Sequence, residues 1–163
     1  MSEGRSGYRG YIASAPVRGT HFPQRVQNLV VRDYAARRGL GFKLSLTEYA
    51  MPGCYMMLEN VLDELPRIEG CIVFSAFMLP KAKKRRLETY ARVLQCGASL
   101  HAALENLVLS NESDISIFED ILDVSSTLSL VPGRGTIDKV LGVRTGPDEA
   151  FWNALADSAT VSS

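Results

Sequence analysis

The stretch GCIVFSAFMLP, residues 70–80, decides the fold of this chain. Its apolar run Cys71–Phe74 lies between a glycine and a proline, which is typical of a strand covered on both faces. Two earlier runs, at residues 10–13 and 42–46, have the length of strands, and apolar residues at helical spacing follow each of them. Strand and helix therefore alternate three times with short connections. This pattern favours a mainly parallel sheet joined by right-handed crossovers.

We predict an α/β fold, a three-layer sandwich in which helices cover both faces of a mainly parallel sheet of four or five strands. The expected strand order is 2-1-3-4, with a fifth strand at one edge, and Val73 is expected to be buried on a central strand. Short strands are expected at residues 99–102 and 107–109, and Asn111 or Ser113 can cap a fourth helix.

The chain is expected to divide into a flexible leader at residues 1–7, an α/β core at 8–123 and a C-terminal arm at 124–163. The arm is rich in Ser, Gly and Pro, is too small to be a domain and carries a short helix at about residues 147–156. We expect its large apolar side chains to bury against another surface, because they would otherwise expose a patch worth several kcal/mol. These side chains are Phe151, Trp152 and Leu155.

The composition is that of an ordinary globular domain, with 46% hydrophobic and 22% charged residues. Eighteen basic residues balance eighteen acidic ones, so no global field attracts DNA or anionic membranes. Three widely spaced cysteines indicate reduced thiols. The polar N-terminus lacks a signal peptide, and no apolar run approaches the roughly 20 residues of a membrane span. We therefore expect a cytoplasmic protein with no nucleic-acid partner and no membrane.

Polar and ionisable side chains gather where the predicted strands end. In an open parallel sheet, ligands bind at the carboxyl ends of the strands, where loops and helix N-termini converge. This pattern predicts a cleft for a small molecule. The residues after the first three strands, and those on or just beyond the fourth, are Ser14, Arg18, His21, Glu48, Tyr49, Tyr55, Ser75, Phe77, Met78, His101 and Glu105.

Glu48 and His101 are the candidates for acid/base catalysis, with His21 in reserve. A carboxylate and an imidazole that face one cleft fit isomerisation, epimerisation or elimination without a metal. No zinc, dinucleotide-binding or P-loop motif is present, so we expect no cofactor. The candidates for substrate binding are Ser14, Arg18, Gln27, Tyr55, Ser75, Phe77, Lys83, Arg86 and Glu105.

Each of these candidates also has a structural interpretation. Glu48 fits a cap for the helix that starts near Gly53, and His101 fits a buried ring hydrogen-bonded to backbone beneath a helix. Tyr55 fits core packing, and His21 fits a surface loop. The run Lys81–Arg86 has five positive charges in six residues, which suits an anionic ligand but also a solvated helix face beside acidic neighbours.

Several strings of this sequence resemble one protein family. They are GYIAS at residues 10–14, Gln27-Asn28, RDYAARRGL at 32–40, TEYAMPGCYMMLENVL at 47–62, IVFSAFMLP at 72–80 and SLHAALENL at 99–107. Together they resemble the sporadic carbohydrate cluster family of small bacterial proteins, which are encoded among polysaccharide-biosynthesis genes. The resemblance covers about residues 8–123, and the tail from Val124 departs from the family's short form. It implies a role in the biosynthesis of a carbohydrate or sugar-bearing metabolite. Together with the polar strand ends, this context predicts an enzyme or binding protein for a sugar, sugar phosphate or nucleotide sugar. We also expect a homo-oligomer.

A second resemblance, in the order of elements and in the GYxxS-like start, is to the catalytic domain of serine recombinases. That family carries an arginine between the tyrosine of the first strand and the nucleophilic serine. Here Ile12 and Ala13 fill the interval, and Ser14 comes one residue early. The family's DRLxR string, which supplies transition-state arginines, is replaced by the apolar FMLP of residues 77–80. The resemblance implies the alternative function, a partner-binding or assembly protein or a recombinase-like module without DNA strand exchange.

Overall fold

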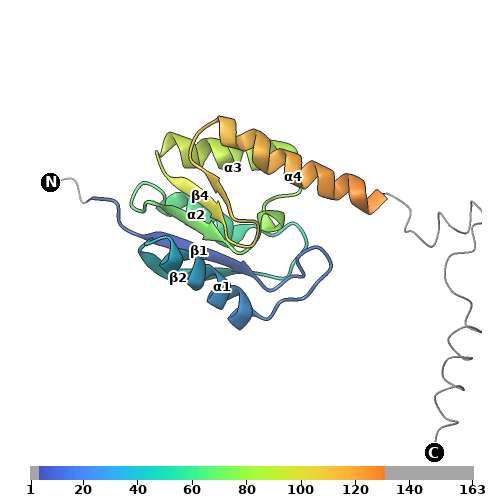
Figure 1. Ribbon diagram of the computed structural model, residues 1–163, viewed down its shortest axis with the longest axis horizontal. Coiled ribbons are helices and arrows are strands. Elements are labelled where there is room, and N and C mark those ends of the chain that lie inside the picture. Colours follow the sequence, from blue (N-terminus) through green and yellow to red (C-terminus); the bar gives the residue numbers. More distant parts are fainter. Residues whose placement is uncertain (1–3, 131–163) are drawn as a thin grey trace, which may run out of the picture. The chain divides into compact units, whose positions relative to one another are not determined.

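The structure, a computed structural model, describes residues 4–130 and is drawn in Figure 1. Residues 4–124 belong to one compact unit, which holds the whole sheet. The burial expected for the apolar side chains of the C-terminal arm lies outside the described residues. The elements are β1 (Tyr8–Ala13), α1 (Gln24–Arg37), β2 (Phe42–Glu48), α2 (Met56–Glu64), β3 (Gly70–Val73), η1 (Ala76–Met78), α3 (Lys83–Gln95), β4 (Ser99–Ala102), β5 (Leu107–Leu109) and α4 (Ser113–Leu130).

The sheet has five strands in the order β2-β1-β3-β4-β5. The first four are parallel to their neighbours, and β5 runs antiparallel to β4. The first three strands begin at Tyr8, Phe42 and Gly70, close to their predicted starts. The expected strand order and the mainly parallel sheet are therefore confirmed, and the edge strand makes the sheet mixed.

β3 is the central strand, and its sequence explains its position. All four of its residues are buried, including Val73 as predicted, and so is the following Phe74. Gly70 lies where β3 passes close to β4 and β1, because a Cβ atom there would overlap the carbonyl oxygen of Ser99 and touch the ring of Tyr8. A larger residue at this position would push the neighbouring strands apart.

The side chains of β1 alternate between two faces and so separate the contacts of α1 from those of α2. The Tyr8 ring packs edge-on against His101, whose ring in turn contacts Tyr34 of α1. The next residue, Arg9, pairs with Glu64 of α2 at 2.8 Å. These two helices therefore contact opposite faces of β1.

The start of the described chain is held against the core. The backbone N–H of Ser6 donates to the carbonyl oxygen of Arg67 at 3.3 Å, and that of Gly7 donates to the Glu69 carboxylate at 2.7 Å. These two residues, expected in the flexible leader, are thus hydrogen-bonded to the turn before β3. The three cysteines are free thiols, and between residues 4 and 130 no helix is long and apolar enough to cross a bilayer.

Candidate functional site

A cleft of about 400 Å³ lies at the carboxyl ends of β1 and β2 and beside η1. Because β2 and β3 flank β1 on opposite sides, the loops that leave these strands diverge here, as at other ligand sites of open α/β sheets. The cleft is thus at the predicted edge of the sheet. Its lining includes Tyr11, Glu48, Tyr49, Tyr55, Phe77, Met78 and Lys81.

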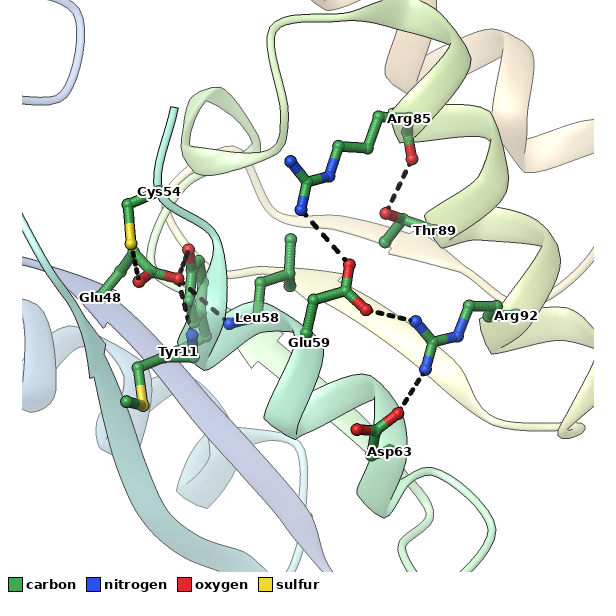
Figure 2. Close-up of polar contacts among 10 residues, drawn as sticks. Tyr11, Glu48, Cys54, Leu58, Glu59, Asp63, Arg85, Thr89 and Arg92 are labelled. Atoms are coloured by element: carbon green, nitrogen blue, oxygen red, sulfur yellow. Dashed lines mark hydrogen bonds and ion pairs between the residues drawn. The ribbon is translucent and has the colours of Figure 1, made fainter. Parts of the chain in front are cut away.

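Glu48 is the buried carboxylate of this cleft, and every contact it makes is structural. One carboxylate oxygen accepts hydrogen bonds from the phenol of Tyr11 at 3.1 Å and from the backbone N–H groups of Met57 and Leu58 at 3.0 and 3.2 Å. The other accepts from the N–H of Tyr49 and from the Cys54 thiol at 3.2 and 3.4 Å. Figure 2 shows Tyr11, Cys54 and Leu58 converging on the carboxylate.

The position of Glu48 explains why α2 starts where it does. No side-chain cap is supplied by Tyr55, the residue before the helix, so the first N–H groups of α2 need another acceptor. The carboxylate provides it at the positive end of the helix dipole. With its oxygens occupied by five donors, Glu48 is a helix cap and a poor general base. The capping interpretation accounts for this residue.

Tyr11 is the buried side-chain partner of Glu48 in this cleft. Burial, followed by the charge of Glu48, raises the pKa of the Tyr11 phenol above its ordinary value. The phenol therefore stays protonated and remains a hydrogen-bond donor to the carboxylate. The two side chains fix each other and leave no free proton acceptor at the base of the cleft.

His101 lies away from the cleft, and both of its ring nitrogens are occupied. Nδ1 is 3.0 Å from the Tyr34 hydroxyl, and Nε2 is 3.0 Å from the hydroxyl of Ser99. Both partners are hydroxyl groups, which can donate or accept, so each ring nitrogen is engaged whichever of them carries the proton. Burial, assisted by Arg38, lowers the pKa of His101 to about 4, so the ring is neutral.

The proposed acid/base pair of Glu48 and His101 is therefore wrong. Glu48 contacts Tyr11, whereas His101 contacts Tyr8, three residues earlier on β1 and on the opposite face of the strand. His21, the reserve, is exposed in the loop before α1 and makes no hydrogen bond or ion pair with the described residues. The structure does not bring these three groups together.

Three other predicted binding residues hold loops in place. Ser75 donates to a carboxylate oxygen of Glu105 at 2.5 Å, and the other oxygen accepts the N–H of Ala76 at 2.9 Å. Gln27 is fully buried and bonds the N–H and carbonyl of Ala13 at 3.0 and 2.8 Å. We correct the substrate-binding roles of Ser75, Glu105 and Gln27 accordingly, because their polar atoms are engaged by the fold itself.

The basic run at residues 81–86 is also largely neutralised, which corrects the roles expected for Lys83 and Arg86. Arg86 forms a buried ion pair with Glu119 of α4 at 2.7 Å and donates to the carbonyl oxygens of Pro80 and Lys81. Lys83 lies 3.9 Å from the same Glu119 carboxylate. The interpretation as a helix face beside acidic neighbours therefore holds for both residues.

Arg85 is engaged in the same way. It lies 3.6 Å from Glu59 of α2, and Figure 2 shows Glu59 bridging Arg85 and Arg92 of α3. Its guanidinium carbon also lies 4.9 Å from the centre of the Tyr55 ring. The phenol of Tyr55 accepts the backbone N–H of Lys81 at 3.3 Å, so this ring joins α2 to the loop before α3.

Of the remaining predicted binding residues, Phe77 lines the cleft, whereas Ser14 and Arg18 are not among its lining residues. Ser14 is half-buried and accepts a hydrogen bond from the Gln24 amide at 2.9 Å. Arg18 is exposed, has a backbone φ of 51°, and stacks its guanidinium 4.7 Å from the centre of the Phe77 ring. Within residues 4–130, no three His, Cys, Asp or Glu side chains gather as metal ligands.

Two arginines of α1, to which the sequence patterns assigned no role, are unpaired in the structure. Arg25 and Arg32 are exposed and make no ion pair with any side chain in residues 4–130. A signal was present, since residues 1–47 contain eight basic residues and two acidic ones. The overall neutrality of the chain concealed this local excess.

Comparison with known proteins identifies the fold. No protein-family description and no curated protein matches this sequence, so the sporadic carbohydrate cluster resemblance stays a prediction. Two solved structures share the fold. One is the N-terminal catalytic domain of TP901-1 integrase, at 13% identity and a TM-score of 0.50, over 74% of this chain and 98% of that one. The other is a resolvase family site-specific recombinase from Streptococcus pneumoniae. It is 12% identical, has a TM-score of 0.54, and matches over 82% of this chain and 98% of its own.

These neighbours correct the expected partners. We expected a carbohydrate-type small molecule and no nucleic acid, whereas two solved structures that share this fold are an integrase catalytic domain and a site-specific recombinase. Balanced total charge was a poor guide, because it says nothing of how charge is distributed over the surface. The chain has the fold of the serine-recombinase catalytic domain.

Proposed function

We propose that this chain is a recombinase-type module that binds DNA without exchanging DNA strands. The observation that carries the proposal is the surroundings of Ser14. Within residues 4–130, the Ser14 hydroxyl is hydrogen-bonded to the neutral amide of Gln24 and to no cation. The fold is thus combined with a serine that lacks the charged partners required for attack on a phosphate.

The chemistry of strand exchange explains why those partners matter. When an oxygen attacks a DNA phosphate, negative charge spreads over the phosphate oxygens in the transition state. In phosphoryl transfer, one arginine directed at those oxygens is worth about 10³–10⁵ in kcat. The two places where the recombinase pattern has arginines are here occupied by the buried Ile12 and Ala13 and by residues 77–80.

Neighbouring groups do not replace the missing arginines. Arg18 stacks on Phe77, and the Arg86 guanidinium is held by Glu119. A proton acceptor for the serine is lacking as well, since the oxygens of Glu48 are occupied and His101 lies on the other face of the sheet. These contacts support a chain that binds DNA and whose Ser14 does not attack a DNA phosphate.

The case for DNA as the partner combines two observations. Two solved structures that share this fold are an integrase catalytic domain and a site-specific recombinase. The N-terminal part of the chain also carries a net excess of six positive charges, because positions 1–47 contain eight basic and two acidic residues. Positive charge of this kind is the main source of sequence-independent affinity for DNA.

A binding experiment with a chemical control tests the proposal. The wild-type chain and the Ser14→Ala variant are titrated into fluorescent duplex DNA, and in parallel each is incubated with supercoiled plasmid. We expect equal, salt-dependent affinities for the two proteins and plasmid that stays supercoiled. Nicking or relaxation by the wild-type protein alone contradicts the loss of strand exchange. Absence of any binding at about 50 mM salt contradicts the DNA partner.

A further inference from the structure

The outer face of α1 is positively charged, and its cations are unpaired. Arg25, Leu29 and Arg32 recur at intervals of four and three residues, so they lie on one side of the helix. The opposite side is the one that packs on the sheet, through Val31 and Tyr34. Figure 1 shows α1 lying along β1 and β2, with its outer side away from the sheet.

Arg25 and Arg32 form no ion pair within residues 4–130. The single acidic residue of the helix, Asp33, is bound by Arg37 at 2.7 Å. Arg38, just beyond the helix, is held by Asn106 at 2.7 Å and lies over the ring of Tyr34. No described side chain pairs with Arg25 or Arg32, so both guanidinium groups face solvent with all their donors available. On α3, by contrast, four of the five basic residues have acidic partners, namely Lys83, Arg85, Arg86 and Arg92, and the exception is Lys84.

The spacing and shape of this surface define the ligand that it suits. Arg32 lies seven positions after Arg25, which corresponds to about 10 Å along the helix axis. A guanidinium fork matches a phosphate in two-point hydrogen bonding. The two groups lie on an exposed helix face with Leu29, 69% exposed, between them, and not in an enclosed site that would suit a compact anion. An extended row of phosphates matches such a surface better than a single small phosphate.

We infer that the outer face of α1 is a docking surface for the phosphate backbone of duplex DNA, with Arg25 and Arg32 as its main contacts. The inference rests on the proposed function and adds to it the place of contact, which lies outside the cleft. Recognition through phosphates alone is independent of base sequence and strongly dependent on salt.

The salt dependence can be worked out from the number of contacts. Each phosphate contact contributes about −0.9 to the slope of log K against log salt concentration. With two contacts, the wild-type chain should lose about tenfold in affinity between about 50 and 200 mM salt. Replacing one arginine should bring the slope closer to zero by about 1. Replacing both should leave little salt dependence.

The experiment compares Arg25→Gln, Arg32→Gln and the double variant with Lys84→Gln, using the full chain and a fluorescent duplex at several salt concentrations. Lys84 is exposed on α3, so its replacement removes the same charge from another element. We expect weaker binding and a shallower slope for the α1 variants, and wild-type behaviour for Lys84→Gln. The α1 variants should melt like the wild type, because neither arginine contacts the described core.

Three results would overturn the inference, and they separate it from the proposed function. If the wild-type chain binds DNA and the α1 variants bind no more weakly than Lys84→Gln, the contact lies elsewhere while the proposed function stands. If the wild-type chain does not bind DNA at all, both fail. If it binds anionic phosphatidylserine vesicles through the same arginines and not DNA, the surface serves a membrane.

Discussion

Replacing Glu48 should destabilise the fold, and the size of the effect follows from its contacts. In Glu48→Ala, the Tyr11 phenol and the N–H of Leu58 lose their acceptor, and both residues are 1% exposed. A buried donor left without a partner costs about 1–3 kcal/mol, so we expect a loss of about 4 kcal/mol in the free energy of unfolding. Glu48→Gln keeps the shape and one oxygen acceptor and should cost about 2 kcal/mol.

The assay is urea unfolding followed by circular dichroism, with Glu88→Ala as the matched control. Glu88 is an exposed carboxylate on α3 and forms no ion pair among the described residues, so its replacement should change stability by less than about 0.5 kcal/mol. For a chain of this size, a loss of about 4 kcal/mol lowers the Tm by about 10 °C. A Glu48→Ala protein as stable as Glu88→Ala would refute the capping role.

Three further predictions concern other parts of the fold. The pKa of His101 is about 4 in the folded chain and 6.5 for an ordinary histidine. The unfolded chain therefore binds a proton first as the pH falls, so the free energy of unfolding should drop by up to about 3 kcal/mol between pH 6.5 and pH 4. His101→Asn should lack this part of the pH dependence in urea unfolding. Glu119→Ala should cost about 3–5 kcal/mol by leaving Arg86 buried and unpaired, whereas Arg86→Met combined with Glu119→Met should recover most of that loss in the same assay. Ser14→Ala should unfold within about 0.5 kcal/mol of the wild type, because the hydroxyl is half-buried and its partner Gln24 is exposed.

The fold followed from local sequence patterns because each of its signals lies within a few neighbouring residues. The run Cys71–Phe74 predicted the central strand, and the strands at Ser99–Ala102 and Leu107–Leu109 have their predicted bounds. The parallel order of the strands also predicted the edge of the sheet at which Glu48 and Phe77 line one cleft. These predictions needed no knowledge of contacts between distant side chains.

The roles of individual residues depended on such contacts and were therefore harder to predict. The string SLHA is covered on both faces, so its pattern does not say which face His101 takes, and the sequence left both the cleft and a buried position open. Arg86 looked available for a ligand because its partner, Glu119, is 33 residues away in the sequence. Glu48 was predicted either as a base or as a helix cap, and only the N–H groups of α2 decided between them.

The most direct test of the central claim is the mass of the protein after incubation with DNA. The wild-type chain and Ser14→Ala are incubated with a duplex library of random sequence under conditions in which the wild type binds, then denatured and measured by intact-protein mass spectrometry. A chain that binds DNA without strand exchange keeps its unmodified mass in both samples. A DNA adduct on the wild-type chain that is absent from Ser14→Ala would show that the serine attacks phosphate, and would contradict the account.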